Sequence, residues 1–223
     1  MVRGVSPVFA VAVVISAMGG CRSFSATEGS DAGPGTDDLD AANHDAPAVG
    51  DSGPIDSGPI EGVPPGGKLV FVTTATAHPP GSTGNFVTLA NAVCTSEAAA
   101  AGRAGSYVVW LATAAQRAIG RLPTDRTWFL RNGVKIGDFK IFDNGAIPFA
   151  IDLDAMGLAP VGDDHAVWTG TIVGGSTATD TCDDWSLSIG SGEVGDFTLA
   201  GAKWASNGGR NCAQDAHFYC FEK

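Results

Sequence analysis

Cysteine placement is the feature that most limits how this 223-residue chain can fold. Cys21 stands apart at the end of a short apolar segment, whereas Cys94, Cys182, Cys212 and Cys220 lie in the C-terminal two-thirds. Four cysteines can form two disulfides in three different pairings. A zinc site is the alternative, but no Cys-x-x-Cys pair occurs and the spacings do not suit zinc. We therefore expect two disulfides, which export to an oxidising compartment permits.

Residues 1–21 are typical of a secretory signal peptide. Arg3 precedes the apolar run 8–15, and small residues then lead to Cys21. The run is shorter than the about 20 apolar residues that a membrane-spanning helix needs. Gly-Gly-Cys at its end resembles the lipobox of bacterial lipoproteins, although Met18 stands where leucine is usual. We expect lipidation of Cys21 and a peripheral protein of the bacterial cell envelope, at the surface or in the periplasm. Ordinary secretion is the alternative.

Residues 22–67 are predicted to form a disordered acidic tether that is rich in Gly, Pro and Ser. They carry almost no large apolar side chains, so they cannot bury enough surface to offset the entropy of ordering. Nine of the 24 acidic residues lie here, and a solvated spacer explains them better than cation capture. The remaining 15, against 11 Lys and Arg from Lys68 onward, leave the following domain near −4. This mild charge argues against nucleic acid or heparin-like polyanions as partners.

Residues 68–223 have a normal length for a domain with one core. Alternating β-forming side chains predict strands, and apolar side chains at helical spacing predict helices. Two early helices followed by a loop-rich β half imply an α+β fold. The expected elements are strands at 68–74 and 106–113, helices at 85–103 and 114–121, a hairpin with a type I′ turn at Asn132 and Gly133, and short β-like pieces at 165–171, 185–189 and 217–221.

Several short motifs resemble those of an endostatin domain, which belongs to the wider C-type lectin-like fold. They are Cys94-x-x-Glu97-Ala98, the run 101–107 with Trp110-Leu111, the run 167–171, Cys182-Asp-Asp-Trp185, Cys212, and the run 218–222. The chain is also similar to endostatin-like domains of bacterial lipoproteins. The resemblance covers roughly residues 68–223 and implies a C-type lectin-like (endostatin-like) domain. It also implies two nested disulfides, Cys94 with Cys220 and Cys182 with Cys212.

Acidic loops raise the question of calcium, which takes six to eight oxygen ligands. The loop triplets and the Trp-Asn-Asp motif of calcium-dependent C-type lectins are missing from this sequence. We therefore expect solvated acidic loops and no cofactor, with calcium as the alternative. The carboxylates that would form such a site are Asp163, Asp164, Asp180, Asp183 and Asp184.

Two further patterns have simpler explanations than the functions they suggest. Gly190, Gly192 and Gly195 spell Gly-x-Gly-x-x-Gly, but no βαβ unit surrounds them, so chance in a glycine-rich chain is the better account. Asp215 could orient His217 toward a nearby serine. However, His217 adjoins a cysteine-bearing strand, so we expect a packed histidine rather than a catalytic base.

Tryptophans supply the candidate ligand contacts. The resemblance implies that Trp168 and Trp185 are core residues. Trp204 lies in a segment with Asn207 and Arg210, where an exposed indole could stack on a sugar or anchor a protein. Alanine at Trp204 or Arg210 is then expected to weaken binding with little loss of thermal stability.

These observations favour a non-catalytic recognition module. We expect it to bind protein or carbohydrate at the cell surface through the long loop between Cys182 and Cys212. A structural envelope lipoprotein without a soluble ligand is one alternative. A secreted hydrolase is another, but the sequence shows no clustered acid, base and nucleophile.

Overall fold

The computed structural model describes residues 62–81 and 85–223, which form a mixed α+β domain with two sheets. The expected signal peptide, Cys21 and most of the expected tether lie outside the described residues. Residues 62–67, which we expected in the tether, already pack against the domain: a Cβ on Gly62 would meet the carbonyl oxygen of Arg131 at 2.5 Å. Among the described residues, no helix is long and apolar enough to cross a membrane.

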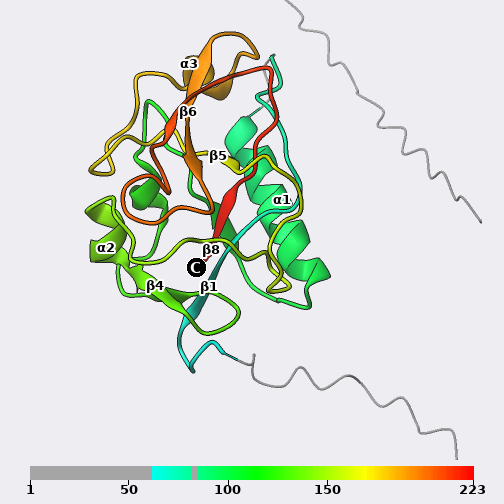
Figure 1. Ribbon diagram of the computed structural model, residues 1–223, viewed down its shortest axis with the longest axis vertical. Helices are drawn as coiled ribbons and strands as arrows, with labels where there is room; N and C mark the ends of the chain where they lie inside the picture. Colours follow the sequence, from blue (N-terminus) through cyan, green and yellow to red (C-terminus); the bar gives the residue numbers. More distant parts are fainter. Residues whose placement is uncertain (1–61, 82–84) are drawn as a thin grey trace, which may run out of the picture. The chain divides into compact units, whose positions relative to one another are not determined.

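The larger sheet has the order β2-β8-β1-β3-β4. The central strand β1 pairs antiparallel with β8, the last strand of the chain, and parallel with β3. The two ends of the domain therefore lie side by side in one sheet (Figure 1). The strands are β1 (Lys68–Val72), β2 (Tyr107–Val109), β3 (Thr127–Phe129), β4 (Lys135–Asp138) and β8 (Tyr219–Glu222).

The apolar side chains of β1 point alternately into two separate hydrophobic cores. Val70 and Val72 point into one cluster, whereas Leu69 and Phe71 point into the other. All four side chains are buried, as alternation on a strand covered on both faces requires. The first cluster holds the indoles of Trp110, Trp128 and Trp204, and the second holds those of Trp168 and Trp185 together with both disulfides.

The long helix α1 (Phe86–Ala100) covers the second core. Asn85 begins it, because its side-chain oxygen accepts a hydrogen bond from the backbone N–H of Thr88 at 3.1 Å. Four buried side chains recur every fourth residue, namely Phe86, Ala90, Cys94 and Ala98. The predicted helix is therefore confirmed, and its buried cysteine bonds to Cys220 in β8.

The smaller sheet, in the order β5-β6-β7, corrects one expectation. Its strands are β5 (Ala166–Trp168), β6 (Ser191–Asp196) and β7 (Gly208–Asn211). Both β6 and β7 lie between Cys182 and Cys212, where we expected a long loop. Glycine has a low β propensity, so this glycine-rich segment was predicted to be a loop and both strands were missed.

Packing requires both glycines of β6, Gly192 and Gly195. A Cβ on Gly192 would lie 2.7 Å from the Sγ of Cys182 and 2.9 Å from the Trp168 ring. A Cβ on Gly195 would lie 1.7 Å from the carbonyl oxygen of Trp204. Strand β6 can therefore pass close to Trp168 and Trp204 only because Gly192 and Gly195 carry no side chain.

Three other local predictions need correction. The expected helix at 114–121 is only the 3₁₀ turn η1 (Ala118–Arg121). The β-like piece expected at 185–189 does not form, and the helical turn α3 (Cys182–Trp185) ends at its first residue. A further helix that the sequence did not predict, α2 (Phe139–Asp143), follows β4.

The β3–β4 hairpin is confirmed, but its connection is a three-residue loop, 131–133. Gly133 alone there has positive φ, which gives a glycine-bulge turn rather than type I′.

The cysteines pair as the resemblance implied. Cys94 bonds to Cys220 and Cys182 bonds to Cys212, with S–S distances of 2.02 and 2.12 Å. Their separations of 126 and 30 residues place the second bond inside the loop closed by the first. The nested framework is thus a property of the fold.

Candidate ligand-binding pocket

Trp204 does not offer an exposed ring to a ligand. It is fully buried, with its ring centroid 4.9 Å from that of Trp110 and 5.2 Å from that of Tyr219. Its indole N–H donates to the carbonyl of Gly145 at 3.2 Å. The prediction of an exposed tryptophan was wrong. Its polar neighbours in the sequence suggested an exposed loop, whereas the chain turns there and places the ring in the core. Asn207 remains exposed.

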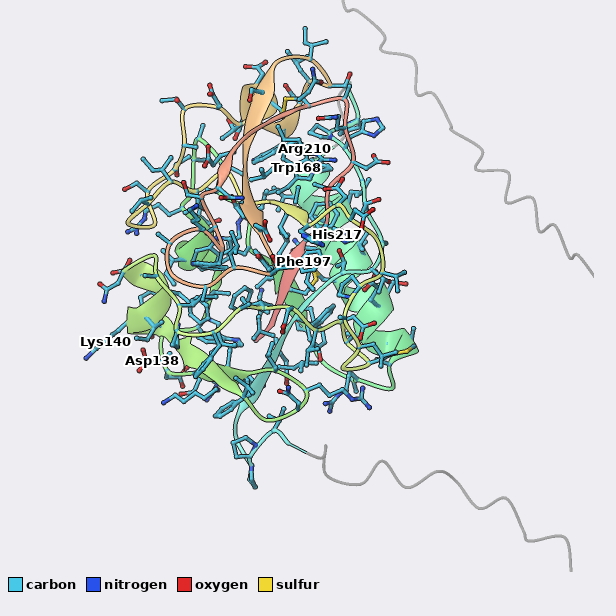
Figure 2. The ribbon with its side chains drawn as sticks, viewed as in Figure 1. Asp138, Lys140, Trp168, Phe197, Arg210 and His217 are labelled. Carbon is cyan, nitrogen blue, oxygen red and sulfur yellow. A yellow bond between two sulfur atoms is a disulfide. The ribbon has the colours of Figure 1, made fainter. Side chains whose placement is uncertain are left out.

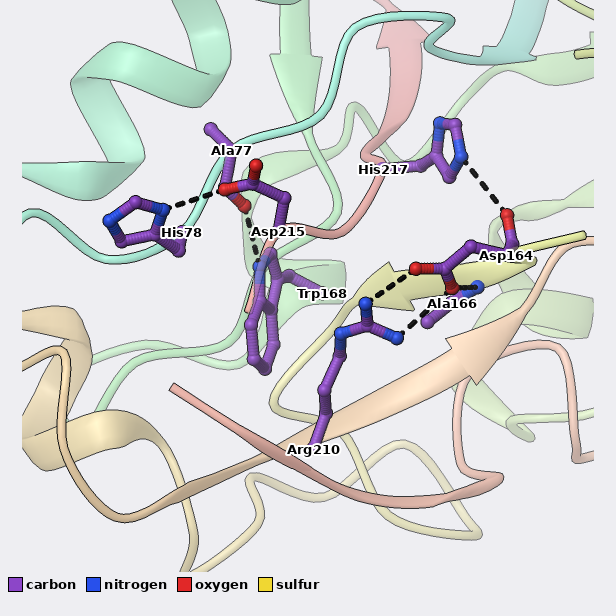
Figure 3. A network of polar contacts seen from close by, with 8 residues as sticks. All are labelled: Ala77, His78, Asp164, Ala166, Trp168, Arg210, Asp215 and His217. Carbon is purple, nitrogen blue, oxygen red and sulfur yellow. Dashed lines mark hydrogen bonds and ion pairs between the residues drawn. The ribbon is translucent and has the colours of Figure 1, made fainter. Parts of the chain in front are cut away.

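Arg210 is also committed within the protein. Both of its terminal nitrogens donate to the carboxylate of Asp164, at 3.0 and 2.5 Å (Figure 3). Partial burial raises the pKa of Asp164. Hydrogen bonds from Arg210 and from the Ala166 N–H, together with the positive charges of Arg210 and His217, lower it by more. The net pKa of Asp164 is therefore below its ordinary value. The predicted ligand contact is therefore an internal clasp between β7 and the loop before β5.

His217 is packed, as expected. It lies beside Phe197 in the interior (Figure 2), with its Nδ1 2.7 Å from the carbonyl oxygen of Thr73 and its Nε2 3.2 Å from that of Asp164. Asp215 turns to a different histidine, His78, at 2.6 Å on the surface. In residues 62–81 and 85–223, no serine hydroxyl hydrogen-bonds to either imidazole, and Asp215 does not orient His217.

The five candidate calcium carboxylates do not gather into one site. Asp164 is held by Arg210, Asp184 accepts the Ala114 N–H at 2.8 Å, and Asp183 accepts the Ser186 hydroxyl at 3.3 Å. Asp163 and Asp180 do not join them. Over the part of the chain that the structure describes, no three His, Cys, Asp or Glu side chains are placed to hold a metal ion.

The turn that carries Asp183 and Asp184 has an unusual backbone. All four residues of α3 have positive φ, from 52° at Cys182 to 68° at Trp185. Left-handed geometry costs L-residues about 1–2 kcal/mol each, so surrounding contacts must stabilise the turn. The Cys182–Cys212 bond holds one end, and at the other the Trp185 indole N–H donates to the carbonyl of Ala112 at 2.6 Å.

This left-handed turn forms one wall of an open pocket of about 510 Å³, within the range of small-molecule sites. The N-terminus of α1 and the segment before and through η1 supply the other walls. The lining residues are Asn85, Phe86, Val87, Thr113, Ala115, Gln116, Arg121, Asp184, Trp185 and Ser186.

Arg121 and Asp184 are the two charged residues of this pocket. The Nε–H of Arg121 donates to the carbonyl of Leu111 at 3.0 Å, which orients the guanidinium. Burial lowers the pKa of Arg121, and the nearby carboxylate of Asp184 opposes that effect. No ion pair within 4.0 Å joins the two residues, so each keeps hydrogen-bonding capacity toward the pocket.

Sequence reasoning found only part of this pocket. It named Asp184 only among the carboxylates of an alternative calcium site, and it expected a solvated acidic loop there. Arg121 and Gln116 carried no signal, because nothing in the sequence brings 116–121 next to a turn more than 60 residues later. A comparison with protein-family models finds no match to this chain, and a comparison with curated proteins also finds none.

Proposed function

We propose that this chain is a surface-tethered lipoprotein whose C-type lectin-like, endostatin-like domain is a non-catalytic recognition module for protein or glycan ligands. The ligand site in this proposal is the pocket between α1, η1 and the left-handed turn, and not the β6–β7 hairpin. One observation carries the proposal: a half-buried guanidinium and a carboxylate line the same open pocket without pairing to each other.

Rigid surroundings support a recognition role. Two disulfides and the indole of Trp185 fix the walls, so little entropy is lost when a ligand orders the site. Strained left-handed residues beside a pocket are more common at functional sites than elsewhere. The pairing of the first and last strands and the nested disulfides support the lectin-like assignment, together with the motifs that resemble endostatin domains.

The ligand site can be tested with a pair of matched variants. Ala115 is exposed and lines the pocket, whereas Ala100 is exposed at the far end of α1. The oxidised full chain would be screened against arrays of glycans and of extracellular proteins and against a library of free short peptides, with calcium and with EDTA. We expect a hit that EDTA leaves unchanged, that Ala115→Trp abolishes and that Ala100→Trp retains. Array hits that both variants retain, or no hits at all, would contradict this assignment.

The anchor is tested separately, in cells. Metabolic labelling with a fatty acid should modify the wild-type protein and not Cys21→Ser, because lipidation takes place on that thiol. Equal labelling of both proteins, or of neither, would contradict the lipoprotein part of the proposal.

A further inference from the structure

The charges of the pocket restrict the ligand it can take, if the pocket is the recognition site proposed above. The lining carries one cation and one anion, and every other lining residue is neutral. A ligand with net charge would leave one of these two groups facing a like charge or facing no partner, which is unfavourable in a partly desolvated site. A ligand that carries both charges satisfies both groups.

The hydrogen-bonding capacity at Arg121 suits a carboxylate. Its Nε–H is used by Leu111, and neither terminal nitrogen has a partner among the described residues. Two parallel N–H donors on a planar guanidinium match the two oxygens of a carboxylate. The backbone bond from Leu111 keeps the group oriented before a ligand arrives, which lowers the entropy lost on binding.

Asp184 provides the complementary end. Its Oδ1 accepts the backbone N–H of Ala114, while its Oδ2 has no partner in the described part of the chain. The left-handed turn holds this carboxylate at the pocket wall. An ammonium group is a donor of the required charge for the remaining oxygen.

We propose that this pocket selects small zwitterions, namely amino acids or short peptides, by binding their carboxylate at Arg121 and their ammonium at Asp184. Apolar wall residues such as Val87 accommodate a side chain of the ligand. The proposal narrows the recognition module from proteins and glycans in general to peptide material with both ends free.

The test uses the dipeptide Gly-Leu and three blocked forms: N-acetyl-Gly-Leu, Gly-Leu amide and the doubly blocked compound. Each is titrated into the oxidised full chain, with binding followed by the NMR shifts of backbone amides at 113–121 and 184–186. Wild-type protein should bind Gly-Leu about tenfold or more tightly than each blocked form, because each blocked form loses a charged hydrogen bond.

Variants then assign each end of the ligand. Asp184→Asn keeps the acceptor for Ala114 and suits a left-handed backbone, so it removes only the charge. It should bind Gly-Leu and N-acetyl-Gly-Leu equally, whereas Arg121→Gln should bind Gly-Leu and Gly-Leu amide equally. Asp125→Asn and Arg126→Gln, an exposed pair outside this pocket, are the matched controls and should behave as wild type.

Two results would overturn this inference. One is the absence of pocket shifts at millimolar Gly-Leu, and the other is equal affinity for the doubly blocked compound. Either result leaves the proposed function standing if an array ligand is still lost in Ala115→Trp. Failure of that array experiment as well would remove the pocket itself as the site.

Discussion

Arg210 in β7 holds both carboxylate oxygens of Asp164, which lies 46 residues earlier in the chain. The same Asp164 accepts the N–H of Ala166 at the start of β5, and its carbonyl oxygen faces the ring of buried His217. This clasp therefore connects the two outer strands of the small sheet and the turn into β8 (Figure 3). The two terminal nitrogens of Arg210 are thus already paired within the protein.

Removing the guanidinium should raise the pKa of Asp164. In Arg210→Ala the strongest hydrogen bond to the carboxylate and the attraction of the guanidinium are both lost, while the partial burial that raises the pKa remains. Because the folded-state pKa lies below the ordinary value of about 3.9, Asp164 stabilises the wild-type protein above that pH, and this contribution is lost as the pH falls through the folded value. A carboxyl-detected NMR titration measures the change.

Lys203→Ala is the control for that titration, because Lys203 is exposed and makes no ion pair among the described residues. It should leave the midpoint of Asp164 unchanged. An unchanged midpoint in Arg210→Ala would contradict the clasp. The loss of unfolding free energy at neutral pH should be no more than about 1 kcal/mol, since the carboxylate is half-exposed.

Trp204→Ala should be among the most destabilising substitutions in the domain. The indole is fully buried between Trp110, Phe142 and Tyr219, so its removal leaves a large cavity and costs about 3–5 kcal/mol of unfolding free energy. Asn207→Ala, three residues away and exposed, should change stability by about 0.5 kcal/mol or less. Denaturant unfolding distinguishes the two. Similar midpoints for both variants would show that Trp204 is not a core residue.

Gly195→Ala should also destabilise the domain, for a different reason. Its Cβ would lie 1.7 Å from the carbonyl oxygen of Trp204, and backbone cannot rotate away as a side chain can. We expect a loss of about 3 kcal/mol or more of unfolding free energy. Gly120→Ala, where the nearest atom is the flexible end of Gln116 at 3.4 Å, should cost far less. Equal thermal midpoints would refute the close crossing of β6.

The two disulfides should contribute unequally. In the chain-entropy account, the 126-residue separation of Cys94 and Cys220 gives about 5 kcal/mol, and the 30-residue separation of Cys182 and Cys212 about 3.5 kcal/mol. Paired Cys→Ala variants, unfolded in denaturant under the same conditions, test this order. A larger loss for the Cys182–Cys212 pair would contradict it.

Local sequence patterns predicted an element correctly where the interactions that form it lie within one short segment. The alternation of β1 and the helical spacing of apolar residues in α1 depend on neighbours within one strand or one helix, so the sequence predicted both elements. The hairpin between β3 and β4 belongs to the same class. The two disulfide pairings came from the resemblance, since the residues themselves left three possibilities open.

Tertiary structure alone decided the remainder. Strand β6 passes close to Trp168 and Trp204 because Gly192 and Gly195 carry no side chain, and residue propensities do not predict this requirement. Trp204 is buried and Arg210 is paired because their partners lie far along the chain, and the same holds for the meeting of Arg121 with Asp184 in one pocket. Sequence determines what each residue can do, but only packing between distant segments determines which residues remain available to a ligand.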